Sequence, residues 1–292
     1  MKKYPEIPVL QPNLSLSGRA KLVPNVTYSD LSGQTLDLLL PWDTDAPGIN
    51  AAAKPLIVFI QGSAWTVPDR NFEIPQLSAY ARRGYVVATV GHRNTQDGYR
   101  FPTFLNDVKN AIRFLRENAD LYKIDPTRVI VWGTSSGGNA ALLVGLTGDD
   151  PEYRDGEHEA FSDRVSAVVS CFSPCDTRAT VWPARHSEGF HPTMVGAFGR
   201  DESRWDALVD RYSPIHLVQP GWDYPPFLLM HGSGDSVVSF SQMERMYHRL
   251  LDCDVEASAY EVRGAEHEGN FWSDETDAVI RNFIDRHAFY RI

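Results

Sequence analysis

The sequence predicts an α/β protein with a mostly parallel central sheet and helices on both faces. Short apolar segments alternate with amphipathic helical patterns along the 292 residues, and this alternation is typical of strand–helix–strand units with right-handed crossovers. Several apolar segments are continuous rather than alternating, which indicates parallel strands covered on both faces. A chain of this length is ample for a buried core.

Seven segments are predicted to be strands. The first, TLDLLL at 35–40, is nearer to the alternation of a half-exposed antiparallel strand. The other six lie farther along the chain and follow helical patterns or turns, at 56–60, 85–90, 128–132, 165–171, 226–231 and 255–262.

Five segments carry the signals of helices. Segment 75–84 has Pro75 near its start and Gly84 at its end, which are the usual start and stop residues. Segment 102–120 places apolar residues at a spacing of three to four, which predicts a buried face formed by Phe104, Val108, Ile112 and Leu115. The other three helices are predicted at 138–146, 239–253 and 274–287.

One stretch interrupts this alternation. Residues 173–225 contain six prolines, several aromatic residues and no clear strand. We expect a single domain over residues 1–292, with an N-terminal extension at about 1–24 and an insertion at about 173–225. The preferred interpretation of the insertion is a cap over the carboxyl edge of the sheet, where ligands bind in such folds. A long surface excursion with a few helical turns is the alternative.

The charge and the cysteines limit the function classes. A net charge of −10 argues against a nucleic-acid or anionic-membrane partner, because phosphate binding needs clusters of basic residues. Three cysteines fit a reducing cytoplasm, and Cys171 and Cys175 lack the second pair that completes a metal site. The sequence shows no signal peptide and no membrane span. We therefore expect a cytoplasmic protein without cofactor or metal, and the oligomeric state, including a homo-oligomer, stays open.

Residues 133–138 read GTSSGG and stand between a strand pattern and a helix pattern. In this context G-x-S-x-G holds a serine in a strained turn with its hydroxyl free. Larger side chains two residues before and after the serine would collide, and the next helix directs its N-terminus at the site. The alternative is the glycine-rich turn of a nucleotide-binding fold, but G-x-G-x-x-G and the P-loop lysine are absent. We expect Ser135 to be a nucleophile.

A serine nucleophile needs a base, and the base needs an acid to orient it. With this kind of corner both follow the serine in the chain, the acid first. The segment HGSGD ends a predicted strand and supplies Asp235, and GAEHEGNFW follows the next strand and supplies His267. The alternatives are that Asp235 caps the helix beginning near residue 239 and that His267 is an ordinary loop histidine.

Five other ionisable residues have different interpretations. His231 is the main rival base, but its place at a strand end favours a hydrogen bond to the backbone. His186 and His191 are too widely spaced for a helical metal pair, so contact with solvent or substrate is the better interpretation. Asp107 and Arg113 share a helix and are expected to be structural.

The segment QGSAW follows the strand at 56–60 and is expected to complete an oxyanion hole. Losing one backbone donor of such a hole typically raises the activation barrier by about 3–4 kcal/mol. Ser63 or Ala64 is expected to supply one N–H group and Ser136 the other. The candidate substrate-binding residues are aromatic, although aromatic residues near a cleft more often belong to the core, and they are Trp65, Trp182, Phe190 and Trp272.

These segments, in this order, resemble the α/β-hydrolase superfamily over about residues 25–290. More narrowly, the chain resembles the bacterial feruloyl/acetyl-xylan esterase group and the hormone-sensitive-lipase-like carboxylesterases. Gln61 and Ser63 depart from the usual His and Gly of that oxyanion loop. The departure leaves the backbone donors in place but weakens the transfer of substrate preference. The matching segments are QGSAW, DVKNAIRFLRENAD, GTSSGG, HGSGD and GAEHEGNFW.

The resemblance implies a serine esterase that works through an acyl-enzyme without a cofactor, with Ser135 as nucleophile, His267 as base and Asp235 as acid. Its substrates would be small esters, including hydroxycinnamoyl (feruloyl) esters and acetylated sugars. Activity should fall on acidification as His267 gains a proton. A serine peptidase of the same fold is one alternative, although such peptidases usually carry a large accessory domain. An inactive small-molecule binding protein is the other, although such proteins commonly lose the serine or the histidine.

Overall fold

Eight strands form one sheet in the computed structural model, which describes residues 7–44, 52–154 and 156–289. The strand order is β1-β2-β4-β3-β5-β6-β7-β8. β2 pairs antiparallel with β1 and β4, and the other neighbours are parallel. The predicted mostly parallel sheet is therefore confirmed. The strands are β1 (Ala20–Thr27), β2 (Thr35–Pro41), β3 (Lys54–Ile60), β4 (Val86–Val90), β5 (Ile124–Thr134), β6 (Ala167–Cys171), β7 (Phe227–Gly232) and β8 (Ala257–Val262).

The first two strands differ from the prediction. The sequence does not predict β1, because Pro24 interrupts its pattern and Asn25 takes a φ of 56° where the register with β2 shifts. A proline is tolerated there because β1 is an edge strand. β2 is antiparallel, as predicted, but almost all of it is buried. The prediction of half exposure is wrong because both faces of β2 contribute to the core.

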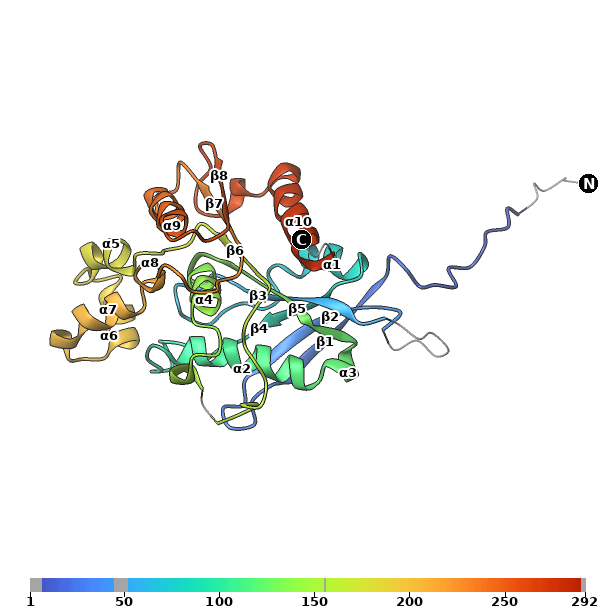
Figure 1. Ribbon diagram of the computed structural model, residues 1–292, viewed down its shortest axis with the longest axis horizontal. Helices are drawn as coiled ribbons and strands as arrows, with labels where there is room; N and C mark the ends of the chain where they lie inside the picture. The colour runs from blue at the N-terminus through green and yellow to red at the C-terminus, as the bar shows by residue number, and fades with distance from the viewer. Residues whose placement is uncertain (1–6, 45–51, 155, 290–292) are drawn as a thin grey trace, which may run out of the picture.

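Helices cover both faces of the sheet (Figure 1). Side chains of α1 and α10 form the core on one face, and side chains of α2, α4 and α9 form it on the other. Within the described residues, no helix combines the length and the apolar composition that crossing a membrane requires. The helices of these two layers are α1 (Ile74–Arg82), α2 (Thr103–Glu117), α3 (Ala119–Tyr122), α4 (Ser135–Leu146), α9 (Ser241–Asp252) and α10 (Asp274–Phe289).

β3 illustrates how the sequence builds both cores. Successive side chains of a strand point to opposite faces, so Val58 contributes to the core under α2 and α4, while Phe59 contributes to the core under α1 and α10. A strand covered on both faces must be apolar at every position, which is why LIVFI lacks alternation. The predicted apolar face of α2 is also confirmed, since Phe104, Val108, Ile112 and Leu115 are all buried.

Residues 173–225 form short helices between β6 and β7 and contain no strand within the described chain. Figure 1 shows these helices gathered beyond one end of the sheet, on the side opposite to the N-terminal segment. Trp205 and Val209 of α7 are buried and belong to the same core cluster as side chains of α2 and α4, so the insertion packs onto the rest of the domain. Whether it acts as a cap stays a prediction. Its helices are α5 (Thr177–Val181), α6 (His191–Phe198), α7 (Trp205–Arg211) and α8 (Pro214–Leu217).

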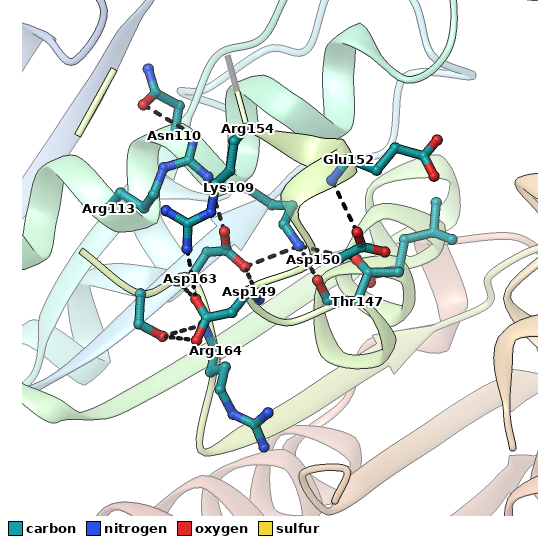
Figure 2. A network of polar contacts seen from close by, with 12 residues as sticks. Lys109, Asn110, Arg113, Thr147, Asp149, Asp150, Glu152, Arg154, Asp163 and Arg164 are labelled. Atoms are coloured by element: carbon teal, nitrogen blue, oxygen red, sulfur yellow. Dashed lines mark hydrogen bonds and ion pairs between the residues drawn. The ribbon is translucent and has the colours of Figure 1, made fainter. Parts of the chain in front are cut away.

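A buried ionic network ties α2 to the segment that follows α4 (Figure 2). One oxygen of the Asp163 carboxylate lies 3.0 Å from Nζ of Lys109 and the other lies 2.9 Å from a guanidinium nitrogen of Arg113. All three side chains are fully buried. Backbone N–H groups extend the network, because Asp149 and Asp163 each donate one to the other's carboxylate. Burial lowers the pKa of Lys109, and the Asp163 carboxylate opposes this effect.

The three cysteines are buried free thiols. Burial raises the pKa of Cys171 and of Cys175 to about 12, so both thiols are protonated at neutral pH. The Cys175 thiol also lies 2.7 Å from the backbone carbonyl oxygen of Gln242. These residues are therefore part of the core packing.

Candidate active site

The carboxyl ends of four parallel strands carry the residues singled out from the sequence. β3 leads into the loop from Gln61, β5 ends at Thr134 directly before Ser135, and β7 and β8 lead to Asp235 and His267. Because parallel strands end at one edge of a sheet, these loops meet there although they lie far apart in the sequence.

Ser135 occupies a sharp turn between β5 and α4. Its φ of 50° is in the left-handed region, which is rare for residues other than glycine and which stores strain. A Cβ atom added to Gly133 would lie 2.1 Å from the carbonyl oxygen of Gly137, so no larger residue fits there. A Cβ atom on Gly62 would lie 2.6 Å from Cβ of Ser135. The turn and the β3 loop therefore interlock around the serine.

His267 connects the serine to the acid. Its Nδ1 lies 2.8 Å from an Asp235 oxygen and its Nε2 lies 2.9 Å from Oγ of Ser135. An ionised carboxylate only accepts hydrogen bonds, so Nδ1–H donates to Asp235 and Nε2 is left to accept the Ser135 hydroxyl proton. The Phe172 ring packs against the imidazole in a T-shaped arrangement, with 4.9 Å between the ring centroids. The structure thus brings Ser135, Asp235 and His267 together.

The Asp235 carboxylate is buried and accepts several hydrogen bonds. The N–H groups of Val237 and Val238 donate to one oxygen at 2.9 and 2.8 Å, while His231 and His267 contact the other. Burial by itself raises the pKa of Asp235, but the hydrogen bonds from the two histidines and from Val238 hold this pKa far below its ordinary value. Asp235 therefore stays ionised well into the acidic range.

His231 also contacts Asp235, and the sequence did not predict this contact. Its Nε2 lies 2.9 Å from the Val238 carbonyl oxygen, as the predicted backbone contact requires, but also 3.0 Å from the Asp235 carboxylate. Two acceptors face this nitrogen, so Nε2 carries the proton and donates to both. His231 is fully buried and four residues before Asp235. The HG-x-x-D spacing was the only sequence signal for this contact.

The backbone of the β3 loop is held beside the serine turn. Ser63 N–H donates to Oγ of Ser136 at 2.9 Å, and the Ser63 hydroxyl donates to the Thr66 carbonyl at 2.8 Å. Both Ser63 groups are thus engaged. Ala64 N–H has no acceptor among the described residues, and Ser136 N–H belongs to the first turn of α4, where N–H groups have no partner in the helix. This arrangement favours Ala64 and Ser136 over Ser63 as oxyanion donors.

Gln61, which stands where the resembling esterases have histidine, has a structural contact. Its side-chain oxygen accepts the Asp69 N–H at 2.6 Å. The Thr134 hydroxyl similarly accepts the Gly62 N–H at 3.0 Å. The two bonds fix the start of the β3 loop from both sides, so Gln61 supports the position of the loop backbone.

A cavity of about 210 Å³ opens beside Ser135 and is largely apolar. Trp65 and Phe190, two of the four predicted substrate-binding residues, line it. Trp182 and Trp272 do not line it. The Trp182 ring is covered by the guanidinium groups of two arginines of the insertion, and Trp272 packs against Phe271 and lines a different cavity. The residues lining the Ser135 cavity are Ala64, Trp65, Ser135, Ser136, Pro174, Thr180, Phe190, Val237 and Val238.

Among curated proteins, the chain is similar to esterases. It is 32% identical over 247 residues to Esterase LipC of Mycobacterium tuberculosis (strain ATCC 25618 / H37Rv), covering 83% of this chain and 58% of the relative. It is 24% identical over 258 residues to isoprenylcysteine alpha-carbonyl methylesterase ICME of Arabidopsis thaliana, covering 86% and 57%. The chain spans 50–58% of the length of LipC, LipM and LipQ, three curated relatives from M. tuberculosis.

Solved structures show the same fold. A truncated form of a carbohydrate esterase from gut microbiota superimposes with a TM-score of 0.74 at 26% identity, covering 94% of this chain and 98% of that one. A bifunctional GH43-CE protein of Bacteroides eggerthii gives 0.77 at 27% identity, covering 91% and 35%. The family model described as BD-FAE matches residues 37–250, which include the serine turn and the acid. The chain therefore belongs to the BD-FAE family and has the α/β-hydrolase fold of carboxylesterases.

Proposed function

We propose that the protein is a serine carboxylic-ester hydrolase that acts through Ser135, His267 and Asp235. One observation carries the proposal: the His267 imidazole lies within hydrogen-bond distance of the serine hydroxyl on one side and of a buried carboxylate on the other. A serine hydroxyl is a weak nucleophile at neutral pH without such a base. The esterase names of the relatives support the same reaction class.

The proposed reaction proceeds in two halves. Nε2 of His267 takes the Ser135 proton as the hydroxyl oxygen attacks the ester carbonyl, and Asp235 stabilises the resulting imidazolium. The N–H groups of Ala64 and Ser136 donate to the oxyanion, and the positive end of α4 adds to this stabilisation. The alcohol then leaves with the proton from His267. Water, activated by the same imidazole, releases the acid and regenerates Ser135.

The proposed substrates are esters with a short acyl group, including acetylated sugars. The cavity beside Ser135 is small compared with the roughly 300 Å³ or more of drug-sized ligand sites, and it is apolar. Phe190 and Val237 are among the apolar residues that line it, and a short acyl chain would be in contact with such a lining. One structural relative is named a carbohydrate esterase, which supports a sugar as the alcohol part.

Two measurements test the proposal. A fluorophosphonate should add once to the wild-type protein, with the adduct mapped to Ser135 by peptide mass analysis, and a folded sample without an adduct would refute the mechanism. A panel of acetyl, butyryl and feruloyl esters of one alcohol should give the highest kcat/KM for acetyl. Preference for the feruloyl ester would overturn the acyl assignment while leaving the reaction class intact, and hydrolysis of an anilide in place of esters would indicate a peptidase.

A further inference from the structure

Three side chains of the types that ligate metals lie close together in the insertion, away from the serine site. Within the described ranges, His186, His191 and Glu202 each offer one ligand atom, and these atoms lie within 4.8 Å of one another. Nδ1 of His186 is 3.8 Å from a Glu202 oxygen, which is too long for a hydrogen bond. Side-chain exposures of 56% for His186 and 47% for Glu202 leave the group open to solvent ions.

The tautomer of His191 is set by the backbone. Its Nδ1 lies 3.0 Å from the Arg185 carbonyl oxygen, so Nδ1 carries the proton and donates it. Nε2 is then left with a lone pair. A histidine that binds a metal commonly donates its other ring N–H to a backbone carbonyl in this way, because the bond fixes the ring and raises its basicity. His191 therefore has the arrangement of a metal ligand before any ion arrives.

The two imidazoles also share a rigid support. Their rings lie 5.8 Å apart, and both pack against the indole of Trp205, at 6.4 Å for His186 and 5.7 Å for His191. Trp205 is buried and its indole N–H donates to the Gly199 carbonyl. The His191 backbone N–H in turn donates to the Ser187 carbonyl at 2.8 Å. The loop that carries both histidines is thus closed on itself.

We infer that His186, His191 and Glu202 bind a divalent transition ion, with Zn²⁺ as the expected metal. Two imidazoles and a carboxylate are a zinc donor set, with a water at the fourth position. In a tetrahedral site with metal–ligand distances of about 2.1 Å, the ligand atoms of one zinc ion lie about 3.4 Å apart. The exposed His186 and Glu202 side chains therefore have to rotate toward His191 for all three to bind one ion. The expectation of no metal rested on helical spacing, but the ligands come from a turn, the first residue of α6 and the 3-10 turn at Glu202–Arg204.

Metal binding would act on the wall of the serine cavity. His191 directly follows Phe190, which lines that cavity. An ion held by residues 186, 191 and 202 closes this part of the insertion into one unit and so restricts Phe190. The inferred role is a structural clip, and binding itself does not depend on the proposed function.

The first test is a Zn²⁺ titration of untagged, chelator-treated protein by calorimetry, with Co²⁺ absorption reporting coordination. We expect one ion per chain and a rise in Tm of about 3–6 °C at saturating Zn²⁺. His191→Gln and Glu202→Gln should each weaken binding at least about tenfold. His216→Asn is the matched control, because His216 is an exposed histidine of the same insertion outside the cluster, and it should bind as the wild type does.

The second test is limited proteolysis. Zn²⁺ should slow tryptic cleavage after Arg185 in the wild type but not in Glu202→Gln, while cleavage after the exposed Arg263 stays unchanged. The inference is overturned if no stoichiometric binding occurs, or if Glu202→Gln, whose exposed side chain makes misfolding an unsuitable explanation, binds Zn²⁺ like the wild type. Repeating the titration on Ser135→Ala protein separates this result from the proposed function, since the affinity should be the same.

Discussion

Asp163 and Asp235 carry two buried carboxylates with different surroundings. Asp163 lies in the ionic network with Lys109 and Arg113, and Asp235 lies in the chain of contacts that runs through His267 to Ser135, which we call the relay. Asp163 divides its two oxygens between the cations of Lys109 and Arg113, and all three side chains are inaccessible to solvent. Asp235 contacts two histidines and two backbone N–H groups, and the chain of contacts continues through His267 to Ser135 beside a cavity.

The difference lies in what compensates each carboxylate charge. The negative charge of Asp163 is compensated by two buried cations, one from Lys109 and one from Arg113, so the network is suited to holding α2 in place (Figure 2). The Asp235 carboxylate is instead held by neutral donors, among them the N–H groups of Val237 and Val238. The relay ends at the Ser135 hydroxyl, which lies within hydrogen-bond distance of Nε2 of His267. Burial and charge alone therefore do not single out a candidate catalytic carboxylate; the contact of Asp235 with a histidine that reaches a serine hydroxyl does.

The largest expected effect comes from removing the Ser135 hydroxyl. Ser135→Ala should lower kcat for a chromogenic acetate by about 10⁶-fold, because the nucleophile is lost, while Tm stays close to the wild-type value. Steady-state kinetics and a thermal melt of the same sample measure both quantities. Residual activity within tenfold of the wild type would show that the relay does not carry the chemistry.

The converse change should affect stability alone. Asp163→Asn leaves Lys109 and Arg113 without their shared counter-ion, and breaking a buried ion pair in this way typically lowers the free energy of unfolding by about 3–5 kcal/mol. Urea unfolding measures the loss, and kcat per folded molecule should be unchanged. Asp223→Asn is the control: Asp223 pairs with Arg164 but is 93% exposed, so little change is expected. Equal stability of the two variants would refute the structural role.

Substitutions of His231 test the contact between this residue and the Asp235 carboxylate. His231→Leu removes one donor from the Asp235 carboxylate and should lower kcat about tenfold with KM unchanged, whereas His231→Gln, which keeps an N–H donor near that position, should retain most of the activity. A merely structural role would lower the stability of both variants without separating their kcat values. Kinetics on folded samples of each variant distinguish the two roles.

Glu73 is a third buried carboxyl group. Among the described residues, it has neither a cation partner, as Asp163 has, nor a histidine partner, as Asp235 has. Burial, together with the nearby charges of Glu268 and Asp277, raises the pKa of Glu73 to about 7. The folded state then binds more protons than the unfolded state between about pH 4.5 and 7, so this group makes stability fall as pH rises through that window. Glu73→Gln should therefore be more stable than the wild type at pH 8 and equal to it at pH 4.5.

The size of the Glu73 effect is expected to be about 1–2 kcal/mol, because Glu73 lines a cavity of about 190 Å³ that solvent can enter and that weakens the charge effects. Urea titrations at pH 4.5, 6 and 8 measure it. A difference that is independent of pH would contradict the assignment of the raised pKa to Glu73.

The sequence predicted the positions of Ser135, Asp235 and His267 more fully than those of the residues around them. Ser135, Asp235 and His267 follow strand ends, and a parallel sheet brings its strand ends together, so their proximity follows from the order of elements. Trp182 and Trp272, which were predicted to bind substrate, lie outside the lining of the cavity beside Ser135, because composition does not tell an aromatic residue of a pocket from one packed under arginines or other rings.

Contacts between distant segments account for the rest. Lys109 and Asp163 come from different elements, and only the packing of α2 decides that they meet. The second contact of His231 depends on how the chain turns after β7. β1 was missed because the edge of a sheet tolerates a proline that would exclude a central strand. Local patterns thus predicted seven of the eight strands and the long helices that cover the sheet, and packing decided which side chains pair.

The place of β8 at the border of the sheet affects the order of events during denaturation. β8 pairs only with β7 among the described strands, and the loop after it carries His267, whereas Ser135 follows β5 in the middle of the sheet. Border strands open locally at a lower free energy than central ones. Such fraying would withdraw the imidazole while the serine turn stays folded, so the protein should become inactive at urea concentrations that leave its circular dichroism unchanged.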